Sequence, residues 1–190
     1  MSKPVLYLFN GKVAKVGNSV LLGTIPPPPP PEDVQIGTQI WKIKNLAIDD
    51  GGSGIKTRTV TYDSEHIVTE YYYTWAAAQR IVSSISGWHI PTIAEAKVLV
   101  DTFGGNGSPL RSTYGWNNGN GTNSTGFTAL PAGYYSYDWL NANDVAEFRL
   151  SDIDPYLFER GSLWLKGPST VSVTGTGDTV YLSVRLIKDS

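Results

Sequence analysis

Residues 86–95 read SGWHIPTIAE, and this stretch decides how the chain is expected to fold. Thr92 and Glu95 have the T-x-x-E spacing of a capping box, in which a threonine hydroxyl and a glutamate carboxylate satisfy backbone N–H groups at a helix start. The stretch therefore predicts a helix from Thr92 to Phe103. The residues expected on its buried face are Ala94, Val98 and Leu99.

Working outward, residues 74–83 predict a second helix, with Thr74 as the N-cap and three alanines as strong helix formers. Residues 55–62 and 67–73 alternate β-formers with polar residues and predict an antiparallel hairpin. Further strands are expected at residues 34–46, 148–150, 162–165, 170–173 and 179–187. Two helices followed by short antiparallel strands predict an α+β fold.

The six prolines from Pro26 to Pro31 mark the clearest boundary along the chain. Each proline ring fixes φ and removes an N–H, so the run is expected to form a polyproline II rod of about 3.1 Å per residue. The sequence thus predicts an arm at residues 1–25, a proline-rich linker at 26–33 and a domain at 34–190. We interpret the linker as a spacer rather than a PxxP ligand, because no basic residue flanks it.

The arm is expected to form a β-hairpin around Asn10-Gly11. An isolated ribbon this small leaves one apolar face uncovered, so something must cover it. We expect the arm to dock on a partner protein or on its own copies; packing back onto the domain is the alternative, which a stiff rod disfavours. The expected anchoring residues are Val5, Leu6, Leu8, Phe9, Val20 and Leu21.

The composition argues against several functional classes. The chain has no Cys, which removes disulfides and thiolate metal sites. Its net charge is −2 and it has no dense Lys/Arg cluster, so nucleic acid is not an expected partner. Membrane insertion is not expected either, because no apolar stretch approaches the roughly 20 residues of a span. The first nine residues lack the apolar region of a signal peptide, which favours assembly in a cytoplasm.

Five segments of residues 34–190 are informative together: IGTQIW at 36–41 with Asn45-Leu46, YTWAAA at 73–78, SGWHIPT at 86–92, NSTGFTALPAGY at 123–134 and SVR at 183–185. In this order they resemble the Fibrobacter succinogenes major paralogous domain, a family placed with C-type-lectin-like folds. The resemblance implies a C-type-lectin-like domain over residues 34–190. Bacterial surface members carry two cysteines whose matching positions here are Ser84 and Leu186, so that disulfide is absent.

These features together predict a non-enzymatic phage virion protein, either a head or tail fibre or a capsid decoration. Residues 1–25 are expected to bind other virion proteins, the oligomer is expected to be a trimer, and a host cell-surface glycan is the expected ligand. The predicted location is the virion surface, after assembly in the host cytoplasm. The alternative is a bacterial surface adhesin or polysaccharide-binding module that is not attached to a virion.

The candidate ligand-binding residues come from a loop rich in Gly and Asn and from the aromatic segment after it. Amides can donate and accept hydrogen bonds, and flat rings can stack on sugars. Trp116 and Tyr134 are expected to be more buried than the aromatic candidates. The candidates are Asn117, Asn118, Asn123, Tyr135, Tyr137 and Trp139.

No catalytic residue, cofactor or metal site is expected. The oxygen-activating cysteines of related enzymes are missing, and no nucleophile elbow is present. His89, inside the family segment, is interpreted as a hydrogen-bonded structural residue. Asp152, Asp154 and Glu159 form the best carboxylate cluster, and a calcium ion there is the alternative to turn or helix capping.

Overall fold

The computed structural model describes residues 15–16, 19–20, 29–156, 158–167 and 169–189. The chain divides into two compact units, residues 1–31 and 32–190. In the first unit, β1 (Lys15–Val16) pairs antiparallel with β2 (Ser19–Val20). The hairpin expected at Asn10-Gly11 lies outside the described residues. So do five of the six anchoring candidates, Val5, Leu6, Leu8, Phe9 and Leu21.

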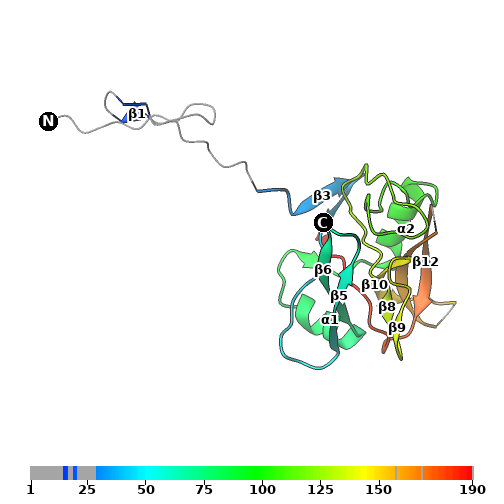
Figure 1. The fold of residues 1–190 in the computed structure, drawn as a ribbon. Helices are drawn as coiled ribbons and strands as arrows, with labels where there is room; N and C mark the ends of the chain where they lie inside the picture. The colour runs from blue at the N-terminus through cyan, green and yellow to red at the C-terminus, as the bar shows by residue number, and fades with distance from the viewer. Residues whose placement is uncertain (1–14, 17–18, 21–28, 157, 168, 190) are drawn as a thin grey trace. The chain divides into compact units, whose positions relative to one another are not determined.

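The second unit is α+β, as predicted, with two helices and small antiparallel sheets among its described residues (Figure 1). One sheet has the strand order β3 (Asp33–Ile36), β4 (Gln39–Lys42), β13 (Ile187–Lys188), β7 (Trp88–His89). Ile187 is paired with both Trp41 and His89. The two ends of the unit are therefore joined in one sheet.

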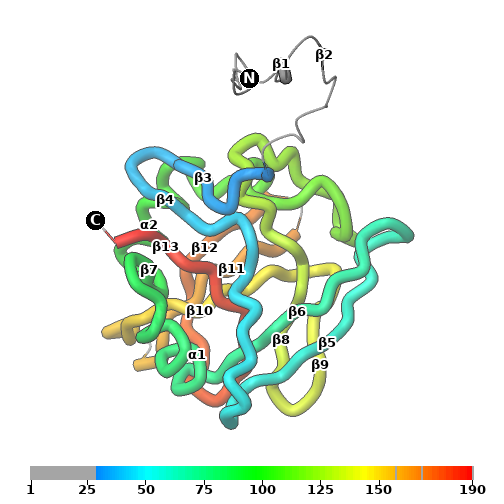
Figure 2. The backbone as a smooth tube through the Cα atoms, turned by 90° about the vertical axis from the view of Figure 1, so that its left-hand side faces the viewer, coloured from blue at the N-terminus to red at the C-terminus, as the bar shows by residue number. Residues whose placement is uncertain are grey.

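Three further sheets lie among the described residues of the second unit. The predicted hairpin is confirmed as β5 (Ile55–Thr61) and β6 (Ile67–Tyr73). A three-stranded sheet holds β10 (Val145–Ile153), β11 (Arg160–Lys166) and β12 (Thr170–Thr176). The last pair is β8 (Tyr134–Tyr135) and β9 (Trp139–Leu140). Figures 1 and 2 both place the β5–β6 hairpin beside the β8–β9 hairpin.

Both predicted helices form, with the predicted caps. The Thr74 side chain accepts a hydrogen bond from the Ala77 N–H at the start of α1 (Trp75–Val82). Thr92 and Glu95 make both bonds of the capping box at the start of α2 (Ile93–Thr102). Neither described helix is long and apolar enough to cross a membrane.

The expected buried face of α2 was wrong at two of three positions. Leu99 is buried, but Ala94 is exposed and Val98 is 50% exposed. Ile93 and Ala96 are buried instead. The N–H of Ile93 donates to the Asp152 carboxylate at 2.6 Å, so β10 holds the start of the helix in this rotation.

The strand expected at residues 179–187 forms only at its end. Leu182 makes an isolated bridge to Tyr73 and Ser183 one to Phe148, and no ladder connects them. The segment has partners in four sheets, because Tyr181 also bridges Tyr135 of β8 and Ile187 pairs with β4 and β7. It runs between two core clusters: Val184 and Leu186 belong to the α1 cluster, and Ile187 belongs to the larger one. Every side chain from Leu182 to Ile187 is buried. Burial on both sides therefore replaces continuous pairing here.

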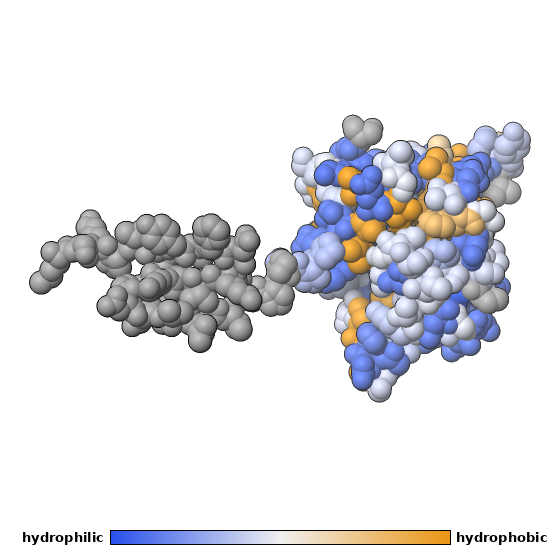
Figure 3. Space-filling view, turned by 90° about the horizontal axis from the view of Figure 1, so that it is seen from above, coloured by the Kyte–Doolittle hydropathy of each residue, from blue (hydrophilic) through white to orange (hydrophobic). Residues whose placement is uncertain are grey.

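The larger core cluster centres on aromatic rings. Phe127 packs edge-to-face with Trp41 and with Phe148 at centroid distances of 5.6 and 5.9 Å. Viewed from above, apolar residues at the surface of the second unit gather in patches between hydrophilic ones (Figure 3). The long segment between α2 and β8, residues 103–133, has no strand longer than a bridge, and it supplies Phe127 to this core.

Candidate functional site

A hollow of about 360 Å³ lies against the β5–β6 hairpin, and we call it the Glu70 hollow. Its walls come from five separate parts of the chain. It is lined by residues 43–47, residues 68–71 of β6, Tyr114, Thr128, Leu130 and Arg185. Most of this lining is apolar, with polar groups on a few side chains, as in small-molecule sites generally.

An acid and a base at this hollow are both nearly inaccessible to solvent. Glu70 is 3% exposed and Arg185 is 1% exposed. The Asn45 amide joins them: its Nδ2 donates to Glu70 at 3.0 Å, and its Oδ1 accepts from Nη2 of Arg185 at 2.7 Å. The Tyr62 hydroxyl also donates to Glu70, at 2.9 Å. Buried charges are tolerated when they are hydrogen-bonded in this way.

Burial shifts the pKa values of Arg185 and Tyr62, but both groups stay protonated at neutral pH. Burial lowers the pKa of Arg185 to about 9, and Glu70 partly opposes that shift. The guanidinium therefore stays protonated at neutral pH. Burial, and then the nearby Glu70 charge, raise the pKa of Tyr62 above its ordinary range. Tyr62 thus keeps its proton and remains a donor to Glu70.

A second hollow, of about 340 Å³, adjoins the first at Tyr114, and we call it the Asn117 hollow. It is lined by Tyr62, Asp63, residues 113–117, Asn120 and Asn143. The Tyr114 ring stacks on His66 with 3.6 Å between centroids and 11° between planes. Because His66 in turn contacts the Asp63 carboxylate at 2.7 Å, the β5–β6 turn holds this ring in place.

Asn117 and Asn118, two of the predicted ligand-binding residues, are exposed beside Asp144. Their Nδ2 groups donate to the Asp144 carboxylate at 3.4 and 3.0 Å, respectively. Asn117 lines the Asn117 hollow. The third predicted amide, Asn123, is half-buried and bonds Thr128 twice, through Oδ1 at 2.8 Å and Nδ2 at 3.0 Å. Its side chain is thus used to close the loop.

The predicted aromatic residues lie on the β8–β9 hairpin. The half-buried Trp139 ring meets Tyr135 at 5.1 Å and Tyr72 at 4.9 Å in edge-to-face contacts. Cations from β5 lie over the same rings, with Lys56 4.2 Å from the Tyr135 centroid and Arg58 5.4 Å from that of Trp139. Those ring faces are thus occupied by the protein itself.

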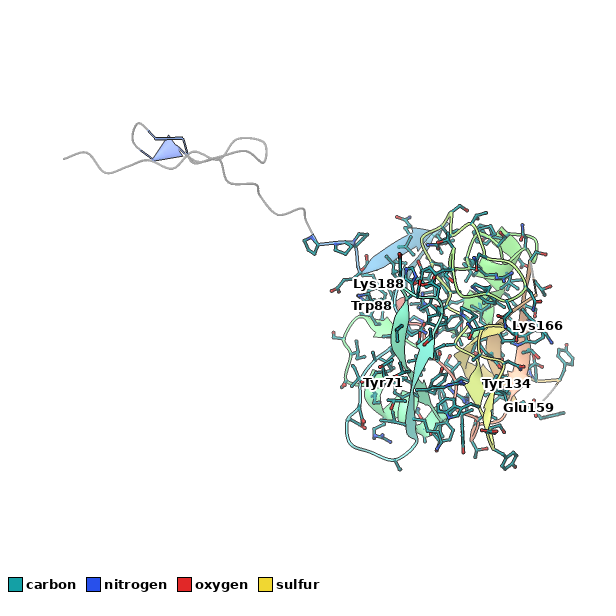
Figure 4. The ribbon with its side chains drawn as sticks, in the orientation of Figure 1. Tyr71, Trp88, Tyr134, Glu159, Lys166 and Lys188 are labelled. Carbon is teal, nitrogen blue, oxygen red and sulfur yellow. The ribbon has the colours of Figure 1, made fainter. Side chains whose placement is uncertain are left out.

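Tyr137, between β8 and β9, is 99% exposed and is the most accessible of the six candidates. Trp116 is 5% exposed, which confirms its expected burial, whereas Tyr134 is half-buried like Tyr135 and Trp139. Figure 4 shows Tyr71 on the β5–β6 hairpin and Tyr134 on the neighbouring β8. The six candidates thus lie in three places: the loop beside Asp144, the contact between Asn123 and Thr128, and the β8–β9 hairpin.

The contacts of the β8–β9 hairpin predict that Trp139 and Tyr137 contribute unequally to the free energy of unfolding. We expect Trp139→Ala to lower the free energy of unfolding by about 2 kcal/mol, because it removes the Tyr72 and Arg58 contacts that hold β8–β9 against β5–β6 and the Tyr135 contact within the hairpin. Tyr137→Ala should change it by less than about 0.5 kcal/mol, because that side chain is solvated. Urea unfolding followed by tryptophan fluorescence or circular dichroism measures both. Equal losses for the two variants would contradict this assignment.

Two of the three carboxylates considered as a calcium site, Asp152 and Asp154, have structural partners. Asp152 accepts from the Ile93 N–H at the start of α2, and Asp154 accepts from the Tyr156 N–H at 2.9 Å. Among the described residues, no group of three or more His, Asp or Glu side chains is arranged to hold a metal ion. His89 lies between two carboxylates, with Nδ1 2.7 Å from Asp189 and Nε2 3.0 Å from Glu95. It joins β7 to the helix cap and to the end of the chain, as a structural residue would.

Sequence reasoning missed the network at the Glu70 hollow. Glu70 and Tyr62 belong to the expected hairpin, where they are two polar residues among many. Asn45 and Arg185 stand in the segments that carry the family resemblance, and they are 140 positions apart in the chain. Their place in those segments was the one available signal, since local patterns do not report contacts over such a separation.

A family model described as the Fibrobacter succinogenes major domain matches residues 34–188. The matched range includes both hollows and every residue of the Glu70 network. The comparisons with curated proteins and with solved structures give no match.

Proposed function

We propose that this chain, which belongs to the Fibrobacter succinogenes major domain family, is a phage structural protein that displays a C-type-lectin-like domain toward host surface glycans. It serves as a head or tail fibre or as a capsid decoration. The observation that carries the proposal is the division of the chain into two compact units at residues 31 and 32. In this proposal the arm attaches to a particle, the prolines act as a polyproline spacer, and the family domain faces outward.

The ligand-binding part of the proposal is supported by the kind of surface that the second unit offers. Two adjoining hollows meet at an aromatic ring, and amide, hydroxyl and carboxylate groups line them. Rings combined with short polar side chains are a common binding composition. No catalytic group is required by this role, and the protein is proposed to act by binding alone.

The attachment role of the arm is tested on the full chain. We expect the wild type to be a trimer by size-exclusion chromatography with light scattering. The double variant Leu6→Asp with Phe9→Asp should be a monomer, because the apolar arm can no longer be buried against its copies. Val98→Asp with Ile153→Asp is the matched control, since it adds the same two negative charges at exposed apolar side chains of the second unit. A monomeric wild type, or an arm variant that stays trimeric, would contradict the arm's role.

A second measurement separates the virion protein from a free adhesin. An antibody against the full chain should label phage particles from the source culture after density-gradient purification. Labelling of bacterial cells, with none on the particles, would overturn the virion assignment in favour of a surface adhesin.

A further inference from the structure

We propose that the Glu70 hollow binds one neutral pyranose ring, with sugar hydroxyls on Glu70 and Asn45 and the apolar sugar face against Tyr71 and Tyr114. This inference rests on the proposed glycan-binding function and adds the place and the class of ligand. The hollow of about 360 Å³ lies near the lower end of small-molecule sites, which span roughly 300–1,000 Å³. It therefore suits a single ring better than a buried chain of sugars.

Glu70, Asn45 and Arg185, which we call the floor of the hollow, have unused hydrogen-bonding capacity at Glu70 and Asn45. A carboxylate can accept about four hydrogen bonds, and an amide NH₂ group can donate two. Glu70 accepts one bond from Tyr62 and one from Asn45, and that last bond uses one N–H of the Asn45 amide. Two acceptor positions and one N–H therefore remain. Neighbouring sugar hydroxyls, each both a donor and an acceptor, match this mixed set.

The charge of the floor favours a neutral ligand. Arg185 uses its five N–H groups within the protein, two on Asn45 and one each on the carbonyls of Lys42, Phe127 and Thr128. None of these groups remains to hold a carboxylate or phosphate at the floor, and Glu70 would repel such an anion there. The other cation among the lining residues, Lys44, is exposed, so water and salt screen its charge. For a cation, the buried positive charge of Arg185 offsets the attraction of Glu70. A ligand without charge avoids both penalties.

The walls supply the apolar contact that a sugar ring needs. Tyr71 and Tyr114 are half-buried aromatic rings, and Val68, Leu46 and Leu130 line the hollow beside them. The hydroxyl groups of Tyr71 and Tyr114 make no hydrogen bond within the described part of the chain. A ring that lies against these side chains buries its C–H groups while its hydroxyls reach the floor.

The site should work without a metal ion. Calcium prefers six to eight oxygen ligands around one point. Glu70 supplies the one carboxylate among the lining residues of the hollow. Binding should therefore persist in EDTA.

Ligand class is tested by titrating the full chain in EDTA, by saturation-transfer NMR and calorimetry. The neutral probes are methyl α-glucoside, methyl β-galactoside and N-acetylglucosamine, and the charged probes are glucuronate and tetramethylammonium. At least one neutral probe should bind with a Kd of about 1 mM, and both charged probes should bind about tenfold more weakly or not at all. No neutral probe binding, or tighter binding of a charged probe, would overturn the inference.

The place of binding is tested with substitutions in the hollow, each checked for folding by circular dichroism. Tyr71→Ala should weaken the neutral probe by about tenfold, while Tyr71→Phe keeps the ring and should bind as the wild type does. Glu70→Gln replaces acceptor capacity by N–H groups and should also weaken binding about tenfold. Tyr156→Ala, at a tyrosine that is 88% exposed between β10 and β11, is the control and should have no effect. Unchanged affinity in both Tyr71→Ala and Glu70→Gln would rule out this hollow.

The two proposals can fail separately. A wild-type monomer that still binds a neutral glycoside would remove the display role and leave the sugar site. A trimer that labels phage particles but binds no neutral probe would do the reverse.

Discussion

Arg185→Ala is expected to lower the free energy of unfolding by about 3–5 kcal/mol, the cost of removing one partner from a buried charged network. Arg185 is 1% exposed, and its guanidinium bonds Asn45 and three backbone carbonyls. The truncation leaves Glu70 as an uncompensated buried charge and the carbonyls without a donor. Urea or thermal unfolding of the full chain measures the loss.

Two further substitutions test whether the loss comes from the buried network rather than from the removal of any arginine side chain. Arg185→Lys retains the charge but has three donors in place of five, so its loss should fall between wild type and alanine. Arg80→Ala removes an exposed arginine that pairs with Asp50 at 2.8 Å, and its effect should be much smaller. If Arg185→Ala were no more destabilising than Arg80→Ala, the Glu70 network would not be a stabilising element.

Local sequence patterns correctly predicted the helices and the hairpin, because the residues that specify them lie within those elements or directly beside them. The capping box at Thr92 and Glu95, the N-cap at Thr74 and the β5–β6 alternation each act within a few residues of where they are read. Each was confirmed. The buried face of α2 was not predicted correctly because apolar residues lie around more than one side of that helix. Its rotation depends on the sheet of β10, β11 and β12 that it contacts, including the bond from Ile93 to Asp152, which lies 59 positions later in the sequence.

Only part of the candidate site could be predicted from the sequence. The amides and rings were recognised as binding groups, but their neighbours decide whether they are available. Trp139 and Tyr135 are covered by Lys56 and Arg58 from β5, and Asn123 is committed to Thr128. The Glu70 hollow combines residues from β6 with Asn45 and Arg185, and no periodicity in the sequence indicates that grouping.

Gly133→Ala is expected to be the other large destabilisation, of more than about 2 kcal/mol. Gly133 stands where the chain enters β8, with φ at +68°, and its N–H donates to the Val145 carbonyl at 2.8 Å. A Cβ at this position would lie 2.2 Å from the Leu140 carbonyl oxygen and 2.7 Å from the Ala142 nitrogen. Both atoms belong to the backbone, so the end of β9 and the residues after it would have to move away from Gly133.

Gly37→Ala is the matched control for this prediction. Gly37 has φ at +59°, close to that of Gly133, but a Cβ there meets nothing within 4 Å. Its loss should therefore reflect the left-handed backbone alone, about 1–2 kcal/mol. Thermal unfolding compares the two variants. Because a steric clash within the backbone adds to a conformational cost that both positions share, equal losses at Gly133 and Gly37 would mean that the hairpin adapts without strain.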